Sequence, residues 1–292
     1  MENYSEITVI IPVGPLVGRL HQLKETLVRC SGLPIQIIIV CDDHNDGTQK
    51  ELKLMIQENH KNIDLIAGKF GGPGPARNAG LEAATSPWIA FWDADDLPNP
   101  SELLRTLSEG MQEEINLICF QYTINDARTL NEIYHSRNRN SVRDNLIAVG
   151  TQPGIWRFVF AKNLISNLKF VNSNMGEDQE FLSKVLIRNP QIMFTSRSVY
   201  RYLIYRKGQL TSNNSNISHL VTIVPLIKKS FSQSPAKYQE AIQLMLSQVI
   251  LTMLKKGDLK VKIFATKFLL SNLLLFVKSI PNILSEKKLR NG

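Results

Sequence analysis

The sequence contains few cysteines, and none of them are paired at metal-binding spacing. Cys30, Cys41 and Cys119 are the only three in 292 residues, and no Cys-x-x-Cys motif occurs. An odd number of widely spaced cysteines fits neither a zinc motif nor paired disulfides, so we expect reduced, buried thiols in a cytosolic protein. The first residues also lack a basic segment followed by an apolar one, so no secretory signal is expected.

Two common nucleotide-binding motifs are missing as well. The first apolar run, residues 7–11, is not followed by Gly-x-Gly-x-x-Gly, which argues against a nicotinamide or flavin dehydrogenase. No Gly-x4-Gly-Lys-Ser/Thr occurs, which argues against a P-loop phosphotransferase. A sugar-phosphate nucleotidyltransferase remains an alternative, although residues 12–19 are a poor version of the glycine-rich signature of that class.

The excess positive charge is concentrated at one end of the chain. The formal net charge is +8, from 34 Lys and Arg against 26 Asp and Glu. Nine basic and two acidic residues lie from Leu251 onward, so this tail carries +7 and the remainder is nearly neutral. A uniformly basic nucleic-acid-binding protein would not show this distribution, so we expect no nucleic-acid partner.

The basic tail is also apolar. Its longest uncharged stretch, residues 268–277, has ten residues, whereas a helix that spans a bilayer needs about 20. We therefore expect no transmembrane span. Lysines on one side and Phe or Leu on the other predict a helix that lies on a membrane surface or packs against the preceding domain. The sequence leaves these two alternatives open.

In the first 121 residues, apolar runs of strand length alternate with helical patterns. This alternation predicts a parallel sheet covered by helices. The expected strands are residues 7–11, 35–41, 63–67, 88–92 and 117–121. Further along, we expect a surface loop or hairpin at 126–143, an amphipathic helix at 176–188, a linker at 213–218 and mostly helices at 219–290.

Aspartates follow two of the predicted strands where these end. Asp42 and Asp43 follow the second strand, and Asp93 and Asp95 follow the fourth. Ligands of such sheets bind beyond the carboxyl ends of the strands. Two carboxylates two residues apart can face one point, and hard cations such as Mg²⁺ or Mn²⁺ accept both carboxylate and phosphate oxygens. Turn formation and helix capping are the alternative roles for such aspartates.

Five segments, in order, resemble the inverting glycosyltransferases of family 2, which have the GT-A fold. They correspond to an opening strand, an acidic turn, an Ala-Arg-Asn-x-Gly helix start, an Asp-x-Asp metal motif and a Glu-Asp catalytic motif. Together they extend over about three-fifths of the chain. The segments are residues 7–13 (ITVIIPV), 37–48 (IIIVCDDHNDGT), 74–80 (GPARNAG), 91–96 (FWDADD) and 176–181 (GEDQEF).

The resemblance implies an α/β fold with a GT-A-like nucleotide-binding sheet and flanking helices. It places the catalytic domain at residues 1–215, with the nucleotide-sugar half at about 1–115 and the acceptor half at 116–215. A helical, basic C-terminal region would cover 216–292. The implied enzyme moves a hexosyl or N-acetylhexosaminyl group from a nucleoside-diphosphate sugar, with UDP-sugar favoured, to a hydroxyl of a glycan or lipid-linked acceptor.

The same resemblance implies Mn²⁺ or Mg²⁺ as cofactor and a role in cell-surface polysaccharide synthesis. The expected location is the cytoplasm, with peripheral contact to the inner face of the cell membrane. Nucleotide-sugar contacts would come from Pro12, Asp42, Asp43, Arg77 and Asp93. The metal would be held by Asp93 and Asp95, and Asp178 would be the general base. Weaker candidates are Glu177, Arg206 and His219.

The sequence departs from the family pattern around the nucleobase. Gly14-Pro15 stands where the family often has an aromatic residue and Asn, and His44 stands where Gly is common. The choice between uridine and another nucleoside therefore stays open.

A sugar transfer that inverts the configuration requires only one catalytic base. A single carboxylate has to accept the proton of the acceptor hydroxyl, unlike the pair used in glycoside hydrolysis. The alternative for Glu177 and Asp178 is simple negative charge at a helix N-terminus. For Arg206 it is a basic strand edge, and for His219 it is a structural histidine. A degenerate, scaffold-like transferase would have lost a metal or base residue, and all the expected carboxylates are present.

Overall fold

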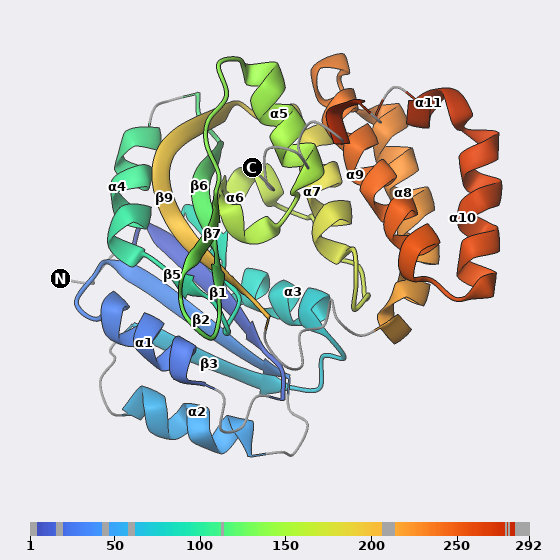
Figure 1. The fold of residues 1–292 in the computed structure, drawn as a ribbon. Helices are drawn as coiled ribbons and strands as arrows, with labels where there is room; N and C mark the ends of the chain where they lie inside the picture. The colour runs from blue at the N-terminus through green and yellow to red at the C-terminus, as the bar shows by residue number, and fades with distance from the viewer. Residues whose placement is uncertain are drawn as a thin grey trace. The chain divides into compact units, whose positions relative to one another are not determined.

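The computed structural model of the chain describes residues 5–15, 20–42, 47–57, 62–111, 114–205, 214–277, 279 and 281–283. The chain divides into two compact units, each assembled from separate segments (Figure 1). The first unit comprises Met1–Asn138, Trp156–Asn172 and Pro190–Arg206. The second comprises Arg139–Ile155, Ser173–Asn189 and Lys207–Gly292. This division differs from the predicted single boundary at residue 215, because two internal segments, Arg139–Ile155 and Ser173–Asn189, belong to the same unit as the C-terminal helices.

The described residues of the first unit form one sheet of nine strands, in the order β3-β2-β1-β4-β8-β6-β9-β5, with β7 beside β6. Neighbours among the first four strands run parallel. Strands β1, β2 and β4 are buried almost throughout, which explains their continuous apolar sequences. The first four strands are β1 (Ile7–Val13), β2 (Ile35–Asp42), β3 (Ile63–Gly68) and β4 (Trp88–Phe91), close to their predicted positions.

The other half of the sheet is mixed, so the parallel arrangement predicted from the first third of the chain holds among β1, β2, β3 and β4 and does not extend to β8. Strand β8 runs antiparallel to both β4 and β6, whereas β9 runs parallel to β6. The predicted loop or hairpin at 126–143 is a hairpin of β6 and β7 followed by the start of a helix. The strands are β5 (Leu97–Pro98), β6 (Leu117–Asp126), β7 (Glu132–His135), β8 (Phe158–Ala161) and β9 (Ile192–Ile204).

Helices cover both faces of this sheet. The core on one face joins alternate residues of β1 and β2 to apolar residues of α1, α2 and α4. Helix α3 lies on the other face, where Gly80 faces Ile10 and Val40. The helices of this unit are α1 (His21–Cys30), α2 (Thr48–Gln57), α3 (Pro73–Ala83), α4 (Pro100–Gly110) and α6 (Lys162–Ile165).

The described part of the second unit is helical. The long helix α9 packs against α5, α8 and α10. The helices are α5 (Val142–Thr151), α7 (Glu177–Ile187), α8 (Leu220–Gln233), α9 (Ala236–Lys256), α10 (Leu259–Ser271) and α11 (Leu273–Val277). The predicted linker at 213–218 is wrong, because Asn214–His219 form a 3-10 helix anchored by buried Ile217 that leads directly into α8.

Within the described ranges, no single helix is long and apolar enough to cross a membrane. One pair of helical segments, Leu259–Ser271 and Leu273–Ile283, reaches the required length and composition together, but the pair is bent by 91°.

Candidate active site

The parallel strands end at a common edge of the sheet and bring several predicted site residues to it. Val13 pairs with Cys41 at the end of β1, and Asp42 pairs with Gly68 at the end of β2. Beyond β4, the Trp92 N–H donates to the Ile10 carbonyl at 3.0 Å, so the following Asp93 emerges beside these ends. In parallel α/β sheets this edge is the usual place for a ligand.

Asp93 and Arg77 form an ion pair at this edge. The Arg77 Nη2 atom donates to Asp93 Oδ1 at 3.0 Å. Arg77 comes from α3 and is buried, with its guanidinium 5.5 Å from the centre of the Phe170 ring. The Asp93 side chain is 29% exposed. The structure therefore places a fixed cation beside a carboxylate that solvent can reach.

Tyr200 fixes the Asp93-Ala94-Asp95-Asp96 loop, and sequence reasoning missed this residue. Its hydroxyl accepts the Asp93 N–H at 3.0 Å and donates to Asp96 Oδ2 at 3.0 Å. The other Asp96 oxygen, Oδ1, accepts the Leu203 N–H at 2.8 Å. Burial, and then the negative charge of Asp96, raise the pKa of Tyr200 well above its usual value, so the phenol stays protonated.

Aromatic rings hold Tyr200 in place. The Trp156 ring stacks on Tyr200 at a centroid distance of 4.7 Å and on Tyr202 at 5.4 Å, while Tyr122 meets Trp156 edge-on at 4.8 Å. The available signal in the sequence was the alternation Tyr200-Arg201-Tyr202, because period two puts both tyrosines on one face of a strand. Asp96 thus serves the fold of the loop, whereas Asp93 and Asp95 are half-buried and their predicted metal role stays a prediction.

Asp42 has a structural task at the same edge. Its two carboxylate oxygens accept the N–H groups of Phe70 and Gly72, each at 2.8 Å. These bonds hold the turn that leads into α3, where Gly71 and Gly72 have φ angles of 79° and 140°. Asp42 therefore positions the helix that carries Arg77, and its predicted contact with the nucleobase stays a prediction.

Pro12 lies near the end of β1, in register with Val40. Its predicted part in nucleotide-sugar binding is untested. Asp43 and Arg206, the remaining nucleotide-side candidates, lie outside the described residues.

The predicted base, Asp178, belongs to the second unit. Helix α7 begins after Gly176, whose φ of 85° is a left-handed conformation that favours glycine. A Cβ at this position would also lie 2.9 Å from the Leu220 side chain. Asp178 is half-buried in the first turn of α7, whereas its neighbour Glu177 is buried. Both carboxylates lie at the positive end of the helix dipole, which favours their charged forms.

His219 also lies in the second unit, at the end of the 3-10 helix. Its Nδ1 atom accepts the Asn174 N–H at 3.5 Å, so the ring contacts the segment that precedes α7. This contact fits the structural alternative, and a metal-binding role for His219 stays a prediction.

The donor groups fit a metal that is shared with a diphosphate. Among the described residues, no group of three or more His, Cys, Asp and Glu side chains could hold an ion by itself. Asp93 and Asp95 supply hard carboxylate oxygens, and Mg²⁺ in particular is commonly bound by one or two carboxylates plus substrate phosphates and water. The residues therefore suit an ion that arrives with the nucleotide sugar.

Comparison with known proteins assigns the class. Residues 8–171 match the profile of the family described as Glycosyl transferase family 2. The chain belongs to this family and is a glycosyltransferase, as predicted.

Among its relatives, the chain is 23% identical to the uncharacterized glycosyltransferase YibD of Escherichia coli (strain K12), over 78% of this chain and 72% of that protein. It is 30% identical to an uncharacterized glycosyltransferase of Rickettsia bellii (strain RML369-C), over 73% of this chain and 33% of that protein. It is 23% identical to the minor teichoic acid biosynthesis protein GgaB of Bacillus subtilis (strain 168), over 80% of this chain. The chain spans only 28% of GgaB.

Solved structures show the same fold. The crystal structure of S. aureus TarS 1-349 has a TM-score of 0.62 at 17% identity, and the similarity covers 95% of this chain and 80% of that one. Mannosyltransferase PcManGT from Pyrobaculum calidifontis, in complex with GDP-Man and Mn²⁺, has a TM-score of 0.59 at 13% identity, covering 99% and 87%. The predicted GT-A fold with a helical C-terminal portion is therefore confirmed.

Proposed function

We propose that this glycosyltransferase is metal-dependent and inverting. It moves a sugar from a nucleoside-diphosphate sugar to a hydroxyl of a glycan or lipid-linked acceptor in cell-surface polysaccharide synthesis. The observation that carries the proposal is the Asp93–Asp95 loop, which Tyr200 and Asp96 fix at the sheet edge beside Arg77. A related TarS structure holds UDP-GlcNAc, which favours UDP-sugar as the donor, whereas PcManGT holds GDP-Man.

In the proposed mechanism, Asp95 and Asp93 would hold Mn²⁺ or Mg²⁺ together with the diphosphate of the donor. The ion supplies charge neutralisation of the leaving group when it is bound. Arg77 adds a fixed positive charge at the same place, and Pro12, Asp42 and Asp43 contact the nucleoside.

Asp178 completes the transfer as general base. It accepts the proton of the acceptor hydroxyl while that oxygen forms a bond to the anomeric carbon and the bond from this carbon to the diphosphate oxygen breaks. Because the attack comes from the side opposite the leaving group, the configuration inverts. Asp178 is preferred over Glu177 because it is the less buried of the two carboxylates.

The first test measures nucleotide release from UDP-, GDP- and dTDP-sugars with Mn²⁺ or Mg²⁺. The wild type is expected to act on one of these donors and only with metal. Asp95→Asn should lose metal-dependent donor binding. Asp178→Asn should keep donor binding and lose turnover by about 10²–10⁴-fold, the usual contribution of a general base.

Asp64→Asn is the matched control, because this exposed aspartate on β3 accepts a hydrogen bond from Gln36 and lies outside the Asp-x-Asp loop. It should behave as wild type. Failure of the wild type to bind any nucleotide sugar would overturn the proposal in favour of a scaffold-like transferase. Full turnover by Asp178→Asn would transfer the role of base to another residue, with Glu177 the next to test.

A further inference from the structure

Helix α10 has two apolar faces, and only one of them is covered. Val261 and Ala265 are buried on the inner face, where α10 packs on α9 and α8 (Figure 1). Leu259, Ile263 and Leu270 project from the opposite side and are 74%, 46% and 66% exposed. These three positions recur close to one line along a helix with 3.6 residues per turn. The predicted division into a lysine side and an apolar side is therefore wrong, since both sides are apolar.

Helix α11 also exposes apolar side chains. Leu273, Leu274 and Val277 are 49%, 83% and 54% exposed. We call the three residues of α10, Leu259, Ile263 and Leu270, the outer apolar stripe. A contiguous exposed patch of large apolar side chains commonly marks an interaction surface.

Lysines lie along both sides of the outer apolar stripe on α10. At 100° per residue, Lys260 and Lys267 fall on one side of the stripe and Lys262 on the other. All three are exposed, as are Lys255 and Lys256 at the end of α9. The one acidic residue in 251–277, Asp258, caps α10 by accepting the Val261 N–H at 2.9 Å. The surface is therefore apolar in the middle and positively charged at its borders.

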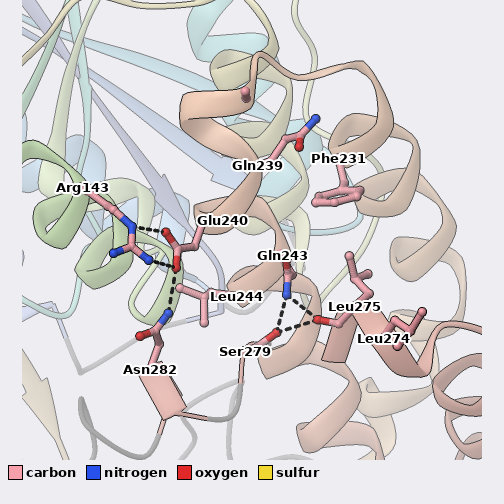
Figure 2. Close-up of a pocket in the computed structure, with 11 residues that line it drawn as sticks. Arg143, Phe231, Gln239, Glu240, Gln243, Leu244, Leu274, Leu275, Ser279 and Asn282 are labelled. Atoms are coloured by element: carbon pink, nitrogen blue, oxygen red, sulfur yellow. Dashed lines mark hydrogen bonds and ion pairs between the residues drawn. The ribbon is translucent and has the colours of Figure 1, made fainter. Parts of the chain in front are cut away.

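Polar contacts with α9 anchor the segment that follows α10 (Figure 2). Glu240 accepts bonds from Arg143 at 2.7 and 2.8 Å and from Asn282 at 2.9 Å. Gln243 donates to Ser279 Oγ at 3.0 Å and also to the Leu275 carbonyl. These bonds tie Leu275, Ser279 and Asn282 to α9. They run along a cavity of about 470 Å³ that Leu274 and Leu275 border.

We infer that the outer apolar stripe binds the surface of an anionic lipid bilayer. Apolar side chains enter the boundary between headgroups and acyl chains, while flanking lysines reach the anionic headgroups. The charge pattern argues against a second copy of this chain, because a two-fold contact would bring the same lysines face to face. The inference concerns attachment and is independent of the proposed sugar transfer.

The test is co-sedimentation of the full chain with vesicles of phosphatidylcholine containing about one third phosphatidylglycerol, against pure phosphatidylcholine. We expect binding to the anionic vesicles that weakens with added salt. Each Lys→Gln substitution at 260, 262 or 267 should lower the partition coefficient about fivefold. The double variant Ile263→Glu/Leu270→Glu should lose binding.

The control is Leu54→Glu/Leu130→Glu, because both leucines are 54% exposed and lie in the first unit. It should bind as wild type. Absence of binding by the wild type, equal binding to uncharged vesicles, or undiminished binding by Ile263→Glu/Leu270→Glu would each overturn the inference. Self-association that the stripe variant abolishes, without vesicle binding, would assign the surface to a second copy instead.

Nucleotide release in vesicle-free solution is measured on the same variants. It should be unchanged, because none of these residues belongs to the proposed active site. Loss of vesicle binding with intact nucleotide release would therefore bear on the attachment surface alone.

Discussion

A single phenol group links the aspartate loop to strand β9. Tyr200→Phe would leave the Asp93 N–H and Asp96 Oδ2 without this partner and would keep the stacking on Trp156. Buried polar groups that lose a partner cost about 1–3 kcal/mol. We expect the loosened loop to bind the metal more weakly. The Mn²⁺ concentration that gives half-maximal nucleotide release should rise about tenfold, a free energy of about 1.4 kcal/mol.

A titration of nucleotide release with Mn²⁺ measures this change, and thermal unfolding measures stability. Tyr202→Phe is the control, because Tyr202 stacks on the same Trp156 ring at 5.4 Å. This variant should leave the Mn²⁺ concentration at half-maximal nucleotide release unchanged. If Tyr200→Phe lowered only the melting temperature, Tyr200 would support the fold without positioning the metal loop.

At the residue scale, the sequence predicted the site residues that belong to a recognisable motif. Arg77 and Asp93 were both predicted, and the structure pairs them. The bond between Tyr200 and Asp96 was not predicted, because it joins residues 104 positions apart. It depends on the register of β9 against β5, which pairs Pro98 with Tyr200, and a single sequence does not fix such a register.

Among the elements, α3 connects the fold most directly to the site. It carries Arg77 and packs on β1 and β2 through Gly80. A Cβ at position 80 would overlap the Ile10 side chain and lie 3.3 Å from Val40 Cγ2. Overpacking of this kind typically costs about 1–3 kcal/mol, so Gly80→Ala should destabilise the protein by that amount. Displacement of α3 should also weaken donor binding.

Urea unfolding and a donor-binding titration check this prediction. Gly14→Ala is the matched control, since nothing lies within 4 Å of a Cβ at that position. Its stability should stay within about 0.5 kcal/mol of wild type. Equal stability of Gly80→Ala and wild type would show that α3 can shift away from the sheet without cost.

Strands that are buried on both faces were predicted more accurately than the others. Strands β1, β2 and β4 are covered on both faces, so their continuous apolar runs stand out in the sequence. Strand β9 has mostly half-buried positions and shows no such run, whereas β8 is an apolar run as short as β4 and was not predicted. The antiparallel pairing of β8 joins segments about 70 residues apart in the chain and leaves no local pattern.

At the scale of the whole molecule, the chain passes between its two units several times. The segments Arg139–Ile155 and Ser173–Asn189 pack with the C-terminal helices, although both precede residues of the first unit in the chain. Composition and charge divide a chain only into consecutive regions, as in the predicted boundary at residue 215. Assignment of α5 and α7 to the second unit depends on their packing against α9 and α8, which is a tertiary property.

The cysteines provide a test of how the first unit unfolds. Cys30 on α1, Cys41 on β2 and Cys119 on β6 are free and buried, as predicted. Burial raises the pKa of the Cys30 thiol to about 12 and also raises the pKa of Cys119. Thiol reagents attack the thiolate, so both burial and the raised pKa protect these groups in the folded state. We expect no labelling by a disulfide reagent at neutral pH without denaturant.

Labelling should begin only at urea concentrations at which the first unit unfolds. A urea series that follows the labelling of each thiol should give the same midpoint for all three, because α1, β2 and β6 belong to one sheet-centred core. Full labelling of all three thiols in guanidinium chloride is the control for reagent access. Labelling of Cys30 at urea concentrations that leave Cys41 and Cys119 protected would instead mean that α1 opens separately from the sheet.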